Sequence, residues 1–128
     1  MLLGNFFDIQ SFTNTETSED QQKYKVSTKL NQNHAIYQGH FPGNPIVPGV
    51  CQVQMVRELA EKALNTSLRL TESDNIKFLS MIIPHENPLL DVDLVIKPLS
   101  ENRYSITATL GKSESIFLKF KGKFEKAV

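Results

Sequence analysis

The sequence has little of what marks a secreted, membrane-spanning or nucleic-acid-binding protein. Cys51 is its single cysteine, which excludes an internal disulfide framework and is typical of a reducing compartment. Neither sign of charge predominates, because 14 Lys and Arg residues balance 14 Asp and Glu residues, so charge does not indicate nucleic acid or a membrane surface as a partner. No apolar run approaches the roughly 20 residues that a membrane-spanning helix needs. These absences predict a globular cytoplasmic protein.

The apolar start of the chain, residues 1–7, also lacks the basic segment of a signal peptide, and Asp8 interrupts it. We therefore expect no signal peptide. The 128 residues suffice for one hydrophobic core and are too few for two. We expect residues 1–128 to form a single domain.

Alternation of apolar and polar residues predicts strands over most of the chain. The polar stretch Thr13–Gln22 is expected to be a loop, and Gly, Pro, Asn and Ser residues separate the later strands. The predicted strands are Phe6–Phe12, Tyr24–Leu30, Ser67–Leu70 together with Asp74–Ile83, Leu89–Lys97, Tyr104–Leu110 and Ser115–Phe124.

A helical pattern begins at Pro48, a residue that suits the first helical turn, and ends near Asn65. Cys51 and Met55 widen its apolar surface beyond one stripe, so we expect other structure to wrap around this helix. One helix with about six mostly antiparallel strands predicts an α+β fold. The apolar residues that recur at three- and four-residue spacing are Val50, Val53, Val56, Leu59, Ala60, Ala63 and Leu64.

The densest cluster of Gly and Pro lies between Asn31 and Gly49, and its second half runs directly into the helix. That half reads Gly39-His40-Phe41-Pro42-Gly43-Asn44-Pro45-Ile46-Val47-Pro48-Gly49-Val50. It resembles the Gly-His-Phe-Pro-Gly-x-Pro-x-x-Pro-Gly-Val motif of 3-hydroxyacyl-acyl-carrier-protein dehydratases of the FabZ and FabA type, and fits it at every defined position. The likeness covers residues 24–124, and the family's N-terminal helix is shortened or absent here.

The resemblance implies a hotdog fold, in which an antiparallel sheet wraps around a long central helix. It also implies a homodimer, possibly assembled further, whose active sites each take residues from both subunits. The substrate would be a phosphopantetheine-linked β-hydroxyacyl chain on acyl carrier protein, and the reaction would need no cofactor. His34 and His85 have no partner at metal-ligand spacing, so we assign no metal.

Dehydration removes a proton from C2 of the acyl chain and delivers one to the leaving hydroxyl on C3. His40 is the natural base, because an unperturbed imidazole has a pKa of about 6.5. The N–H groups of Gly49 and Val50 at the helix start would stabilise the thioester oxygen. Gly43 and Gly49 would let the backbone approach the substrate, and Pro48 would keep the loop rigid. The alternative is that the loop is only a structural turn. Apolar residues expected to line an acyl tunnel, or equally to belong to the core, are Phe41, Ile46, Val47, Phe78 and Leu79.

The chain departs from the family on the helix. Gln54 stands where the family has an acidic residue, and Glu58 stands where the family often has Gln. A glutamine amide cannot deliver a proton, and losing a general acid typically costs about 10²- to 10⁴-fold in rate. Three hypotheses follow. His40 acts as both base and acid while Gln54 orients the hydroxyl; Glu58, one turn deeper, supplies the proton; or dehydration is lost.

Each of these residues also has a purely structural interpretation. Glu58 could pair with Lys62 on the helix surface, and Gln54 could be a buried amide satisfied by backbone. Cys51 lies in the first helical turn, where a thiol pKa can fall, but we interpret it as a small buried hydrophobe. Lys119, Lys121 and Lys123 share one strand face, which is either simply solvated or docks an acidic carrier protein.

The predicted function is (3R)-hydroxyacyl-acyl-carrier-protein dehydration with catalytic residues His40, Gln54 and Glu58. The alternatives are a hotdog acyl thioesterase and a catalytically impaired protein that binds acyl carrier protein.

Overall fold

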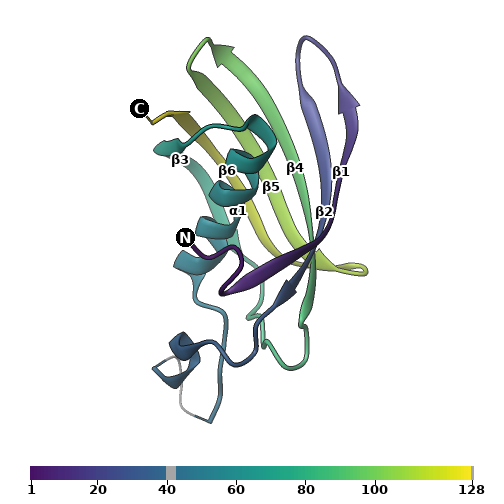
Figure 1. The fold of residues 1–128 in the computed structure, drawn as a ribbon, viewed down its shortest axis with the longest axis vertical. Coiled ribbons are helices and arrows are strands. Elements are labelled where there is room, and N and C mark those ends of the chain that lie inside the picture. The colour runs from purple at the N-terminus through teal and green to yellow at the C-terminus, as the bar shows by residue number, and fades with distance from the viewer. Residues whose placement is uncertain (40–42, 128) are drawn as a thin grey trace.

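The computed structural model describes residues 1–39 and 43–127, which form one antiparallel sheet curved around a long helix (Figure 1). A short 3₁₀ helix, Ala35–Gln38, precedes this helix, α1, which spans Gly49–Leu64. The six strands are β1 (Phe7–Thr17), β2 (Gln22–Leu30), β3 (Leu68–Phe78), β4 (Leu89–Ser100), β5 (Arg103–Lys112) and β6 (Ser115–Lys126).

The strands lie in the order β1-β2-β4-β5-β6-β3, and every neighbouring pair is antiparallel. The α+β prediction, an antiparallel sheet of about six strands wrapped around one helix, is therefore confirmed. β1 and β3 are the two edge strands, and α1 leads directly into β3. The loop that carries the sequence motif thus leads into the start of α1, and the end of α1 leads into β3.

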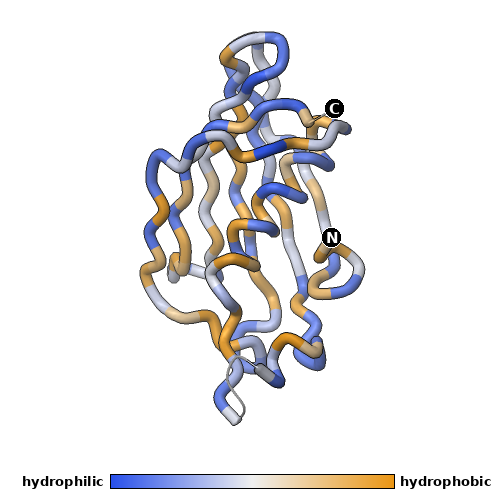
Figure 2. The backbone as a smooth tube through the Cα atoms, turned by 90° about the vertical axis from the view of Figure 1, so that its left-hand side faces the viewer, coloured by the Kyte–Doolittle hydropathy of each residue, from blue (hydrophilic) through white to orange (hydrophobic). Residues whose placement is uncertain are grey.

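The core lies between α1 and the inner face of the sheet. Apolar residues alternate with polar ones along the central strands, as the hydropathy colouring shows (Figure 2). β4 buries Leu90, Val92, Leu94 and Ile96, while Asp91 and its other odd-numbered neighbours face outward. Burying one such aliphatic side chain contributes about 1.5–3 kcal/mol, so this repeated pattern decides which face of the sheet meets the helix.

Helix α1 turns one side to the sheet, and that side differs from the predicted stripe. Cys51, Met55 and Leu59, spaced by one turn, are buried, whereas Val50 is 77% exposed. The prediction that Val50 belongs to the buried stripe is wrong, because the helix is rotated to place Cys51 against the core. Asn65 ends the helix in the left-handed conformation at φ 52°. Among the described residues, no helix is both long and apolar enough to cross a membrane.

The largest differences from the predicted strand ends are those of β1 and β3. β1 continues to Thr17, into the stretch expected to be a loop, because its pairing with β2 uses backbone groups and does not need apolar side chains. The turn is confined to residues 18–21, where the Ser18 hydroxyl accepts hydrogen bonds from the backbone.

β3 forms one strand with two register shifts and ends at Phe78, not at Ile83. Beyond β3, the Ile82 carbonyl accepts a hydrogen bond from the Val47 N–H, at 2.8 Å. This contact ties the end of the motif loop to the segment after β3. It also brings the two walls of the candidate site together.

Candidate active site

Two of the predicted site residues, His40 and Phe41, lie outside the described residues. The structure describes the chain on both sides of them. Before them, the Nδ1 atom of His34 accepts a hydrogen bond from the Ile36 N–H at 3.1 Å, which caps the 3₁₀ helix. After them, Gly43 has a φ of +82°, a backbone conformation that L side chains rarely adopt. Gly43 is therefore needed for the path of the loop, whatever its contact with a ligand.

The first turn of α1 leaves two backbone donors unpaired. Pro48 is the N-cap residue, and its carbonyl accepts hydrogen bonds from Cys51 and Gln52 at 3.1 and 3.2 Å. No residue in the described part of the chain accepts a hydrogen bond from the N–H of Gly49 or Val50. Because the positive end of the helix dipole lies here, these N–H groups can bind a negatively charged or polarised oxygen.

A groove of about 410 Å³ opens beside this turn. Its walls are mainly apolar, and the ring of Phe78 packs so closely on Gly49 that a Cβ there would lie 2.7 Å from it. Phe78 is 51% exposed and Val47 is 3% exposed, so of these two tunnel candidates only Phe78 offers much surface. The residues lining the groove are Ile46, Val47, Gly49, Gln52, Phe78, Ser80 and Met81.

Gln52 is a groove residue that the sequence reasoning did not single out. It is 3% exposed; its Nε2 donates to the Val47 carbonyl at 3.3 Å, and its Oε1 has no partner within the described residues. The signal in the sequence was its position, since Gln52 shares a helix side with the buried Met55 and Leu59. A polar residue on an otherwise apolar side was the feature to notice.

Gln54 and Glu58 are brought together by the helix. The Gln54 Nε2 donates to Glu58 Oε2 at 2.7 Å. Glu58 is only 4% exposed, and its carboxylate also accepts from the backbone N–H of Leu2, at 2.9 and 2.8 Å to its two oxygens, and of Leu3 at 2.7 Å. The start of the chain therefore lies against α1, as Figure 1 shows.

This arrangement differs from both structural interpretations of the pair. No ion pair between Glu58 and Lys62 is present among residues 1–39 and 43–127. Glu58 is also buried, whereas the predicted pair would lie on the helix surface. Gln54 is half-buried, and its amide is bonded to a carboxylate rather than to backbone. The structure does not test whether Glu58 is a catalytic acid, so that role stays a prediction.

Cys51 is buried in the core side of the first turn, as expected of a small hydrophobe. Burial raises the pKa of the Cys51 thiol, which is the opposite of the fall that a helix start can cause. Burial also raises the pKa of the nearby Tyr37, with the Cys51 charge adding to the effect. Neither group is therefore ionised near neutral pH, and neither is prepared to act as a nucleophile.

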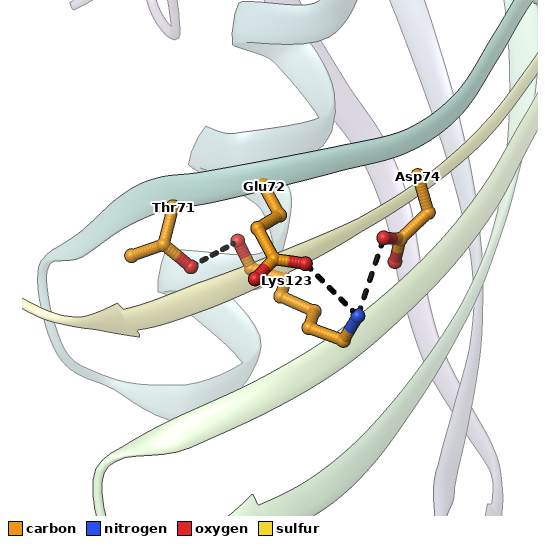
Figure 3. A network of polar contacts seen from close by, with 4 residues as sticks. All are labelled: Thr71, Glu72, Asp74 and Lys123. Atoms are coloured by element: carbon orange, nitrogen blue, oxygen red, sulfur yellow. Dashed lines mark hydrogen bonds and ion pairs between the residues drawn. The ribbon is translucent and has the colours of Figure 1, made fainter.

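The lysine face on β6 is partly neutralised. Lys119 and Lys121 are exposed, whereas the Lys123 ammonium lies 3.1 Å from Glu72 and 3.2 Å from Asp74, both on β3 (Figure 3). Hydrogen bonds to Glu72 and then Asp74 raise the pKa of Lys123. Lys119 and Lys121 therefore keep exposed positive charge on this face, together with Lys77, the β3 partner of Lys119.

The chain is similar in sequence to curated dehydratases. A 3-hydroxyacyl-[acyl-carrier-protein] dehydratase FabZ of Acetivibrio thermocellus is 31% identical over 88 residues, which is 61% of this chain and 58% of the relative. The chain thus matches less than two thirds of that relative's length.

Solved structures share the fold at low identity. An uncharacterized protein from Erwinia carotovora subsp. atroseptica superposes with a TM-score of 0.67 at 18% identity, covering 93% of this chain and 94% of the other. The dehydratase heterocomplex ApeI:P from Xenorhabdus doucetiae gives 0.64 at 18% identity, covering 92% and 96%. The ApeI-like family, described as ApeI dehydratase, matches residues 15–122. With most of the chain matched by the family and nearly all of it by the fold, this protein belongs to the ApeI-like dehydratase family of hotdog proteins.

Proposed function

We propose that this protein dehydrates β-hydroxyacyl thioesters carried on the phosphopantetheine arm of an acyl carrier protein. The observation that carries the proposal is the pair of N–H groups of Gly49 and Val50, which have no acceptor among the described residues and lie beside an apolar groove, at the end of the motif that begins at Gly39. A thioester oxygen that gains charge needs such donors, and an acyl chain needs such walls.

In the proposed reaction His40 removes the proton from C2, and the electron pair moves toward the thioester oxygen. The N–H groups of Gly49 and Val50 stabilise that oxygen. The electron pair then forms the C2–C3 double bond as the C3–O bond breaks, and protonated His40 returns its proton to the departing hydroxide, which leaves as water. Gln54 orients the hydroxyl and supplies no proton.

This assignment prefers His40 as both base and acid over Glu58 as the acid. Glu58 is already engaged by Gln54, Leu2 and Leu3, and all of these contacts use it as an acceptor. To donate a proton to a substrate it would have to give up at least one of them. Its role in the proposal is therefore to support Gln54.

The proposed assembly is a homodimer in which the sheet continues from one copy into the next. Two observations support it: β3 is an edge strand, and large apolar side chains are exposed at and after its end, namely Phe78, Leu79 and Met81. Exposed apolar groups of this size are typical of surfaces that meet a partner. In such a dimer His40 of one copy would meet Gln54 of the other.

Gln54 favours one further candidate, a catalytically impaired subunit that binds acyl carrier protein and depends on an active partner chain. Its amide cannot act as an acid, and a dehydratase with a similar fold, from Xenorhabdus doucetiae, is described as a heterocomplex. This candidate predicts carrier binding without turnover, and turnover once Gln54→Glu is introduced. A thioesterase would instead release free thiol.

The test is to incubate the purified protein with 3-hydroxyacyl thioesters while following enoyl absorbance and, separately, free thiol. We expect enoyl product from the wild-type protein, none above background from His40→Ala, and no thiol release. Full activity in His40→Ala would refute the mechanism. Thiol release without enoyl product would support the thioesterase instead.

A further inference from the structure

The contacts of Glu58 determine how the side chain of Gln54 is turned. The carboxylate is 4% exposed and receives N–H groups from Leu2, Leu3 and Gln54 at 2.7–2.9 Å. An ionised carboxylate has only acceptors, so the amide of Gln54 must present its NH₂ group to it. The oxygen and nitrogen of an amide have nearly the same shape, but only the nitrogen can donate to a carboxylate. The partner of Gln54 therefore decides which way its amide is turned.

The same contact decides what Gln54 offers on its other side. With Nε2 bound to Glu58, the Oε1 branch of the amide points away from the carboxylate. Oxygen accepts hydrogen bonds and donates none, so a ligand on that side meets an acceptor. Without Glu58 the amide could turn over and present its NH₂ group.

We propose that Glu58 is a positioning residue that makes Gln54 a hydrogen-bond acceptor and thereby selects substrates with a donor on C3. The inference rests on the proposed function, because it takes the ligand to be a 3-substituted acyl thioester. A 3-hydroxyl group donates to Gln54 Oε1, whereas a 3-oxo group has no hydrogen to donate and meets oxygen with oxygen. A site that hydrogen-bonds a hydroxyl discriminates strongly against an analogue that lacks it.

The N-terminal segment takes part in this selection. Leu2 and Leu3 hold the carboxylate through three contacts, while Gln54 holds it through one. The backbone donors therefore keep Glu58 in place when the Gln54 side chain moves. Glu61, one turn further along α1, offers a matched control. Its Oε2 accepts from the Leu68 N–H at 2.8 Å, and within the described part of the chain it makes no hydrogen bond with Gln54.

The experiment compares binding of 3-hydroxyoctanoyl and 3-oxooctanoyl thioesters of N-acetylcysteamine, in the full chain carrying His40→Ala to prevent turnover. We expect the hydroxyl compound to bind about tenfold more tightly. Adding Glu58→Gln should reduce this ratio severalfold, because the amide of Gln54 can then present either its oxygen or its NH₂ group to the ligand. Glu61→Gln should leave the ratio unchanged, although it also replaces the charged acceptor of a backbone N–H by a neutral one.

A second measurement does not depend on the ligand. In ¹⁵N-labelled protein the side-chain NH₂ signal of Gln54 should move in Glu58→Gln and stay in place in Glu61→Gln. If Glu58→Gln does not fold, Glu58→Asp keeps the charge but is shorter by one methylene group, and the same changes are expected.

An unchanged binding ratio together with an unmoved Gln54 signal would overturn the inference. Its failure is distinct from failure of the proposed function. If the wild-type protein makes no enoyl product but the ratio depends on Glu58 as described, dehydration is refuted and the acceptor role of Gln54 stands. If neither thioester binds, both are refuted.

Discussion

The first turn of α1 and its later turns differ in whether their polar groups have hydrogen-bond partners in the described part of the chain. At the start, the N–H groups of Gly49 and Val50 have no partner in the described part of the chain and lie beside a groove. Two and three turns on, backbone donors hold two carboxylates: Leu2 and Leu3 at the start of the chain hold Glu58, and Leu68 at the start of β3 holds Glu61. One helix therefore carries backbone donors without partners in the described chain at its start, and carboxylates bound by backbone in its later turns.

The difference teaches how to distinguish functional from structural polar groups in this protein. A buried polar group left unpaired costs about 1–3 kcal/mol, so the core pairs such groups wherever it can. Donors that stay unpaired at an accessible helix start can instead be satisfied by water or by a ligand. The predictions below test where the boundary between the two regions lies, from the largest expected effect to the smallest.

The largest effect is expected from His40→Ala, which removes the proposed base next to the open turn. The rate of enoyl formation should fall by about 10²- to 10⁴-fold, the usual contribution of a general acid or base. Steady-state kinetics with a 3-hydroxyacyl thioester measures this, and thermal unfolding should show little change. A loss of activity that matches a loss of stability would instead give His40 a structural role.

The next effect compares two carboxylates in the closed region. Glu58→Ala should lower the free energy of unfolding by about 2–4 kcal/mol, because it strands the N–H groups of Leu2 and Leu3. Glu61→Ala should cost about 1–2 kcal/mol, since it strands only that of Leu68. Urea denaturation measures both values. Equal losses would mean that the N-terminal segment contributes nothing through Glu58.

Cys51 tests whether the open region extends into the core. Because burial raises its pKa, alkylation by iodoacetamide should be slower in the folded protein than in urea and should require higher pH. The Cys51 thiol keeps its proton to higher pH in the folded state than in the unfolded state. Its contribution to stability is therefore complete below the ordinary thiol pKa and is lost as pH rises through the raised one. Rapid alkylation of the native protein near neutral pH would show that the first turn is open on both sides.

The ion pairs of Lys123 test how much an exposed ion pair contributes to the free energy of unfolding. Lys123→Met should lower the free energy of unfolding by less than Glu58→Ala or Glu61→Ala does, and the loss should shrink as salt is added. Its two carboxylate partners, Glu72 and Asp74, are solvent-accessible, unlike Glu58. A loss as large as that of Glu58→Ala would remove the contrast between surface and buried pairing.

Much of the fold was predictable because the signals are local. The period of two in β4 and β5 and the Pro48 start of α1 depend on neighbouring residues alone. The extent of β1 was not predictable in this way, because its outer half is polar and forms a strand only by pairing with β2. Edge strands of this kind are decided by the neighbouring strand, not by their own side chains.

The candidate site divides in the same way. The motif from His40 to Val50 was identified by its resemblance to the family's motif, and the same resemblance marked Gln54 and Glu58 as an unusual pair. The partners of Glu58 were not predictable, since Leu2 and Leu3 contribute backbone N–H groups, which every residue other than proline has and no side chain reveals.

The sequence by itself determined the family, the antiparallel sheet with one helix, and the presence of an amide where a carboxylic acid was expected. It did so because motif, hydrophobic period and residue type are read along the chain. Only the tertiary structure decided that Glu58 is buried and that the backbone N–H groups of Leu2 and Leu3 bind its carboxylate. These hydrogen bonds join residues far apart in the sequence, and the packing of the start of the chain on α1 brings them within hydrogen-bonding distance.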